Sequence, residues 1–113
     1  MLTTIAYATH TAHLDPMTGV GVLVMPSPDD DMSDPLGGVA TLHAAGWDAA
    51  VRDLGARGWE PLADEWDLPM VDGTTADGRT VVALYGRESI VSDPDMGELA
   101  NAQRELHVLA GLA

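Results

Sequence analysis

Two stretches of this chain carry apolar side chains at spacings of three and four residues, which is the pattern of a helix with one buried face. The first follows Ser33-Asp34-Pro35, where Ser or Asp caps free N–H groups and Pro fits the first turn, and we expect it to run to about Arg57. Its apolar face comprises Leu36, Val39, Ala40, His43, Trp47, Ala50, Val51 and Leu54. Glycines weaken this prediction, so the alternative is a break near Gly46 with Asp48 capping a second, short helix. Gly58 is a natural C-terminal stop.

The second helical stretch follows Ser92-Asp93-Pro94, which repeats the start signal, and is expected to end near Gly111. Its predicted buried face comprises Met96, Leu99, Ala100, Gln103, Leu106, Leu109 and Ala110. Two one-sided helices require an apolar layer to cover, so an adjoining sheet is expected.

Four segments have the composition of strands: residues 3–14, 20–25, 59–66 and 80–86. Residues 20–25 are apolar on both faces, which favours a central position in the sheet. Pro61 favours an edge position for residues 59–66. Turn formers at residues 15–19 and the pair Asp77-Gly78 predict two hairpins. Residues 67–76 are expected to form an irregular connection.

The resulting prediction is an α+β fold of order ββαββα, a four-stranded antiparallel sheet with both helices on one face. Residues 1–113 are expected to form a single acidic domain, since the length suits one domain. A shift of 59 positions aligns Gly19 with Gly78, Val22 with Val81, and the two helix-start signals. This alignment raises the hypothesis of duplicated halves, residues 1–58 and 59–113; the alternative is two helices that use the same start signal.

Charge restricts the classes of partner. Eighteen Asp and Glu residues face five Arg and no Lys, for a formal net charge of −13. Such a chain repels nucleic-acid phosphate and anionic membranes, and attracts basic proteins. The alternative is that the charge only keeps the protein soluble. No segment resembles a secretory signal or a transmembrane span, so we expect a cytoplasmic protein, and the composition is typical of a bacterial or phage sequence.

The sequence holds no Cys, so disulfides and thiolate chemistry are excluded. His10 and His13 would point to opposite faces of a strand and would not share a metal ion; His13 with Asp15 gives an incomplete site. Asp29, Asp31 and Asp34 lie at spacings that hard cations tolerate, but the Gly turn and late Glu of a calcium loop are missing. We expect a core role for His43, and no cofactor or metal.

The segment Leu54-Gly55-Ala56-Arg57-Gly58-Trp59-Glu60, followed by a strand that ends at Leu84-Tyr85-Gly86-Arg87, resembles a small bacterial domain family of unknown function. In that family a short helix ends in Gly-Trp-Glu and leads into an antiparallel strand pair. The chain departs from the family at Pro61 and in residues 67–76. The resemblance implies the helix-to-strand junction and no site residues.

The leading functional hypothesis is a non-catalytic interaction protein, encoded by a phage or other mobile element, that docks a basic protein through an acidic surface. The candidate binding residues surround an aromatic side chain or lie in the acidic loop: Trp66, Asp64, Glu65, Asp67, Asp29, Asp30 and Asp31. One alternative is a small enzyme or ligand-binding domain that uses a His/carboxylate cleft. Another is a subunit that forms a homodimer through an edge strand.

Overall fold

The computed structural model describes residues 2–26, 44–87 and 95–112. Several predicted features lie outside these ranges: the helix starts at 33–35 and 92–94, the loop with Asp29, Asp30 and Asp31, and His43. The described elements follow the order βββαβββα. They are β1 (Thr3–Ala6), β2 (Thr11–Asp15), β3 (Val20–Val24), α1 (Ala44–Ala56), β4 (Trp59–Pro61), β5 (Val71–Thr74), β6 (Thr80–Gly86) and α2 (Met96–Ala110).

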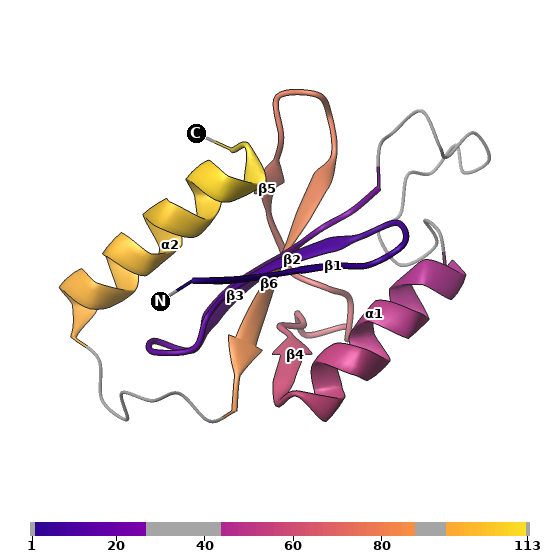
Figure 1. Ribbon diagram of the computed structural model, residues 1–113, viewed down its shortest axis with the longest axis horizontal. Coiled ribbons are helices and arrows are strands. Elements are labelled where there is room, and N and C mark those ends of the chain that lie inside the picture. Colours follow the sequence, from indigo (N-terminus) through magenta and orange to yellow (C-terminus); the bar gives the residue numbers. More distant parts are fainter. Residues whose placement is uncertain (1, 27–43, 88–94, 113) are drawn as a thin grey trace.

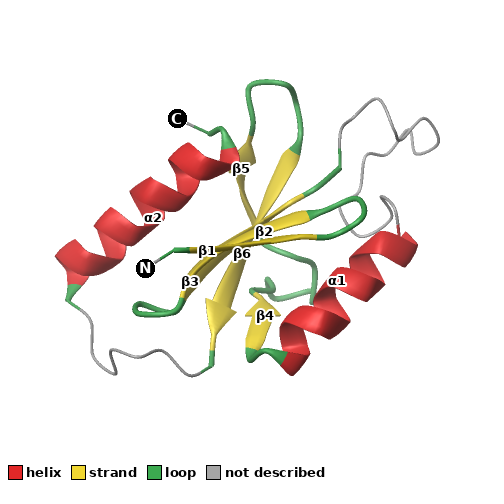
Figure 2. Cartoon of the chain, viewed as in Figure 1, coloured by secondary structure: helices red, strands yellow, loops and turns green. Residues whose placement is uncertain are grey.

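The antiparallel sheet has six strands rather than four, in the order β1-β2-β3-β6-β4, with β5 also paired to β6. Figure 2 shows the strands gathered between the two helices. The prediction of an α+β fold with an antiparallel sheet is confirmed, and the order ββαββα is wrong. β3 lies between β2 and β6 and is buried from Gly21 onward, as its apolar sequence indicated.

One extra strand arises because residues 3–14 form a hairpin instead of one strand. The amide of Tyr7 donates to the carbonyl of His10 at 2.7 Å, which closes a turn without Gly or Pro. His10 is 1% exposed there, so burial supports a turn that the local sequence does not announce. β1 and β2 then pair with Thr3 opposite Leu14 and Ala6 opposite Thr11.

The other extra strand arises from residues 59–76. β4 ends at Pro61, a residue that has no N–H to donate to a neighbouring strand, and β5 forms within the segment that was expected to be irregular. β4 lies at the sheet edge, as predicted. The hairpin turns at residues 15–19 and at Asp77-Gly78 are confirmed, with Gly19 and Gly78 at φ of 77° and 90°.

The helices cover opposite faces of the sheet, which corrects the prediction that they share one face. Leu23 of β3 joins a cluster with Ala50 and Leu54 of α1, whereas Val22 and Val24 join a cluster with α2. Alternate residues of a strand point to opposite faces, so α1 and α2 lie on either side, as Figure 1 shows. Duplicated halves around an antiparallel β3–β6 pair would place both helices on one face, so this placement differs from that expectation.

The helices differ in how well their buried faces were predicted. α1 runs unbroken through Gly46 and ends two residues before Gly58, and its buried residues Ala50 and Leu54 belong to the predicted face. α2 is capped by Asp95, which accepts from the amide of Glu98, and by Gly111 at φ 85°. Its buried residues are Ala102, Leu106 and Ala110. Met96 is 79% and Leu109 47% exposed, so the predicted face is rotated from the observed one.

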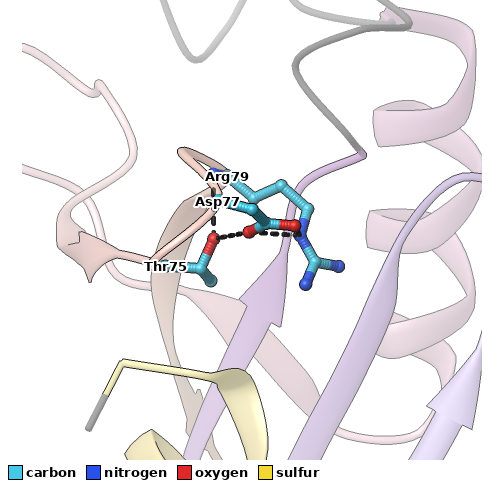
Figure 3. Close-up of polar contacts among 3 residues, drawn as sticks. All are labelled: Thr75, Asp77 and Arg79. Atoms are coloured by element: carbon cyan, nitrogen blue, oxygen red, sulfur yellow. Dashed lines mark hydrogen bonds and ion pairs between the residues drawn. The ribbon is translucent and has the colours of Figure 1, made fainter.

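The β5–β6 turn is closed by a polar cluster of Thr75, Asp77 and Arg79 (Figure 3). The Thr75 hydroxyl donates to Asp77 Oδ1 and accepts from the amide of Arg79 at 2.9 Å. Arg79 Nε lies 3.1 Å from Asp77. The hydrogen bond from Thr75 and then that from Arg79 lower the pKa of Asp77. This cluster holds the turn and carries no sign of a ligand site.

Candidate functional site

The candidate site is a loop of residues 62–70 that leaves the sheet edge and returns to it, here called the Trp66 loop. Both ends are anchored on one residue of β6. The amide of Leu62 donates to the carbonyl of Ala83 at 3.0 Å, and the amide of Ala83 donates to the carbonyl of Met70 at 3.0 Å. The amide of Met70 also donates to the carbonyl of Leu62 at 2.9 Å. The base of the loop is therefore a continuation of the sheet.

Asp64 organises the tip of the loop. Its Oδ1 accepts from the amide of Trp66 at 2.8 Å and from that of Leu68 at 3.0 Å. Its own amide donates to the carbonyl of Leu68 at 2.9 Å, and its carbonyl accepts from the amide of Asp67 at 3.1 Å. Asp67 has φ of 62°, in the left-handed region that Asp tolerates better than most residues. Side chain and backbone together define one loop conformation.

The loop exposes a large aromatic side chain among other apolar ones. Trp66 is 73% exposed, the second most exposed large hydrophobic residue among those described. The apolar side chains exposed beside it in sequence are Leu62, Leu68, Met70 and Val71. Single exposed apolar residues are ordinary, but five within ten positions are a concentration that favours a binding role. The carboxylates of Asp64, Glu65 and Asp67 are interspersed among them and are also exposed.

The structure thus brings together four of the seven predicted binding residues, Trp66, Asp64, Glu65 and Asp67. It places them in a loop rather than on the expected strand edge, because β4 ends at Pro61. The sequence reasoning missed Leu62, Leu68, Met70 and Val71. The signal available was the mixture of apolar and acidic residues between Pro61 and Val71, which is too polar for a buried strand and too apolar for an ordinary loop.

The three described histidines, His10, His13 and His107, lie apart, and His43, which belonged to the cleft hypothesis with His10 and His13, is outside the described residues. His10 is buried in the β1–β2 turn with its ring 6.4 Å from that of Trp47. His13 points to the other face, where its Nδ1 lies 3.1 Å from the Thr4 hydroxyl, and burial lowers the pKa of His13. His107 contacts Asp72 between α2 and β5. Within residues 2–26, 44–87 and 95–112, no group of three His, Asp or Glu side chains is arranged to hold a metal ion.

Comparisons with known proteins give no identification: no family model, curated protein or solved structure matches the chain. The resemblance of residues 54–60 to a domain family stays a prediction. The junction it implied is present, since α1 ends at Ala56, Gly58 has φ of 90° and Trp59 begins β4. Among the helices in the described part of the chain, none combines the length and apolar character needed to cross a bilayer.

Proposed function

We propose that this chain is a non-catalytic interaction domain that binds a basic protein partner through the Trp66 loop. The observation that carries the proposal is the 73% exposure of Trp66 on a loop whose conformation is set by hydrogen bonds of Asp64. Tryptophan is among the residues most enriched at binding hot spots. A loop that is already ordered loses little conformational entropy on binding, so more of the contact energy appears as affinity.

Charge supports a basic partner. Asp64, Glu65 and Asp67 surround Trp66 with carboxylates, and the whole chain has a formal net charge of −13. An apolar centre with a polar rim is the usual composition of a protein interface. The negative field speeds encounter with a positively charged surface. An arginine of the partner would meet both an aromatic face and carboxylates, a combination that favours a guanidinium group.

The test is affinity capture from cells of the source organism with wild-type protein, Trp66→Ala and Met96→Ala as baits. Met96 is 79% exposed on α2 and is the matched control for removal of an exposed apolar side chain. The proposal expects basic proteins that bind wild type and M96A and are lost with W66A, since truncation of a hot-spot residue costs about 2 kcal/mol or more. Equal capture by wild type and W66A would exclude the Trp66 loop as the binding surface.

The contribution of charge is tested with the double variant E65Q/D67N, which removes two carboxylates and leaves Asp64 to hold the loop. Association of the captured partner is expected to slow, and its dependence on ionic strength to become weaker, because long-range attraction is screened by salt. An unchanged salt dependence would show that the acidic rim takes no part in binding.

A further inference from the structure

A second candidate surface lies on the face of the sheet that α2 covers, near β1 and β2 and therefore at the edge opposite β4. A hollow of about 290 Å³ separates the β2–β3 turn from the first half of α2. Carboxylates line it from both sides: Asp15 at the end of β2, and Glu98 and Glu105 on α2. Asn101 adds an amide between the two glutamates. Residues seven apart on a helix lie on one face, so Glu98 and Glu105 face the hollow together.

Two polar groups of this hollow, the Asp15 carboxylate and the Thr18 hydroxyl, are withdrawn from solvent. Asp15 is only 8% exposed, and its Oδ1 accepts one hydrogen bond, from the amide of Met17 at 3.1 Å. The hydroxyl of Thr18, which also lines the hollow, is buried and has no hydrogen-bond partner among the described residues. No ion pair within the described parts of the chain involves Asp15, Glu98 or Glu105. Carboxylates that are partly removed from water are normally paired, so a bound cationic group with several donors would serve the carboxylate oxygens that have no ion pair.

The distribution of carboxylates over β2 and α2 bears on the kind of cation that fits the hollow. Among the described residues, Asp15, Glu98 and Glu105 do not form a cluster of the kind that holds a metal ion. A guanidinium carries five N–H donors in a planar fork and can reach acceptors that are separated by several ångströms. An arginine side chain therefore fits the arrangement better than a single small ion does.

An apolar hollow of about 340 Å³ adjoins the acidic one and shares Leu2 and Glu105 with it. Its wall includes Val108 and Leu109 of α2, which are 60% and 47% exposed. Beside Leu2 begins β1, whose four residues carry no charge. Among the described strands, β1 pairs only with β2, so its outer edge offers backbone groups to an extended chain.

We propose that these two hollows form one binding groove for an extended peptide segment of a partner protein, in which an arginine lies next to an apolar residue. The arginine enters the acidic hollow, and the apolar side chain covers Val108 and Leu109. The groove is distinct from the Trp66 loop, which lies on the β4–β5 side of the sheet. A result that rejects the groove therefore leaves the proposal for the Trp66 loop standing, and the reverse also holds.

The test is a titration of the ¹⁵N-labelled protein with N-acetyl-Leu-Arg-amide, followed by amide chemical shifts. The control probe is N-acetyl-Leu-citrulline-amide, which has nearly the same shape and no charge. The proposal expects saturable shifts at Asp15, Thr18, Glu98 and Glu105, and binding at least about tenfold weaker for the citrulline probe. Equal affinity for both probes, or shifts scattered over the acidic surface, would overturn it.

Two matched variants complete the experiment. E105Q is expected to weaken binding of the arginine probe by about fivefold, whereas D48N, which makes the same change in net charge at an exposed residue of α1 outside both surfaces, leaves it unchanged. Equal effects of the two variants would mean that the probe senses only overall charge, and the groove would be rejected. Shifts at the same residues on concentrating the protein without probe would identify a second copy of the chain as the occupant and would also overturn the proposal.

Discussion

His107 on the last turns of α2 lies 2.6 Å from Asp72 on β5, measured between Nε2 and Oδ2. The two side chains are 28% and 16% exposed, so water screens the contact only in part. Gln103 adds a longer contact from its Nε2 to Asp72 Oδ1 at 3.4 Å. These contacts attach the C-terminal part of α2 to β5, the strand that pairs with the first residues of β6.

Replacing Asp72 by Ala is expected to lower the free energy of unfolding by about 1–2 kcal/mol, because it leaves the partly buried His107 without its acceptor. Chemical denaturation followed by circular dichroism measures the change. Asp48→Ala is the control, since Asp48 is exposed on α1. If the two variants were equally stable, the contact would contribute nothing to the attachment of α2.

Overpacking at Gly21 provides a second prediction. A Cβ there would lie 2.9 Å from Leu14 Cδ2 and 3.0 Å from Trp59 Cζ3. Because the added methyl group meets a packed core, Gly21→Ala is expected to destabilise the protein by about 1–3 kcal/mol. A Cβ at Gly55, inside α1, meets nothing within 4 Å.

The matched change Gly55→Ala is expected to stabilise the protein by about 0.5–1 kcal/mol, the usual helix preference for Ala over Gly. Thermal unfolding of the two variants measures the change in melting temperature that each substitution causes. A melting temperature that Gly21→Ala leaves unchanged or raises would contradict the close packing of Leu14 and Trp59 against Gly21.

The phenol of Tyr7 donates to Asp53 Oδ2 at 2.6 Å, and Arg57 Nε contacts the same oxygen at 2.8 Å. Burial first, and the bond to Asp53 second, raise the pKa of Tyr7 from 10 to about 12. A raised pKa means that the protonated phenol stabilises the fold fully below pH 10. This contribution is lost as the pH rises through about 12.

The titration of the Tyr7 phenol can be followed by ultraviolet absorbance after a rapid pH jump, before the protein unfolds. The Tyr85→Phe variant is used because Tyr7 is then the remaining tyrosine. The midpoint is expected near 12. Asp53→Asn should bring it down without reaching 10, since burial remains. A midpoint at 10 in the Tyr85→Phe protein would show that Tyr7 is solvated and not bonded to Asp53.

The fourth prediction concerns the hydrogen bonds that hold the Trp66 loop in one conformation. Asp64→Ala removes the acceptor of the Trp66 and Leu68 amides. Their hydrogen exchange is expected to accelerate by about tenfold, since each hydrogen bond contributes about 1 kcal/mol. Amides of β6 should be unaffected.

Glu65→Ala is the control, because Glu65 is exposed on the same loop and leaves the Asp64 acceptor in place. Unchanged exchange in the Asp64→Ala protein would show that the loop does not depend on this carboxylate. The proposed preorganisation of Trp66 would then lose its basis.

The sequence by itself determined features that depend on a few neighbouring residues. Gly19, Gly58, Gly78 and Gly111 all adopt the left-handed conformations expected at turns and helix ends. The apolar run of β6 forms a strand with the predicted limits, Thr80 to Gly86. In each case a conformational preference of the backbone, or the polarity of adjacent residues, is sufficient.

Only the tertiary structure decided which faces are covered. β3 is apolar on both faces because a helix lies on each side, and residue spacing alone does not place the second helix. The buried face of α2 follows its contact with Val22 and Val24, which leaves Met96 and Leu109 exposed. The turn at His10 and the return of the Trp66 loop to Ala83 likewise depend on partners distant in sequence. A side chain becomes buried only when another element packs against it, so which residues are buried depends on how the helices and strands pack together.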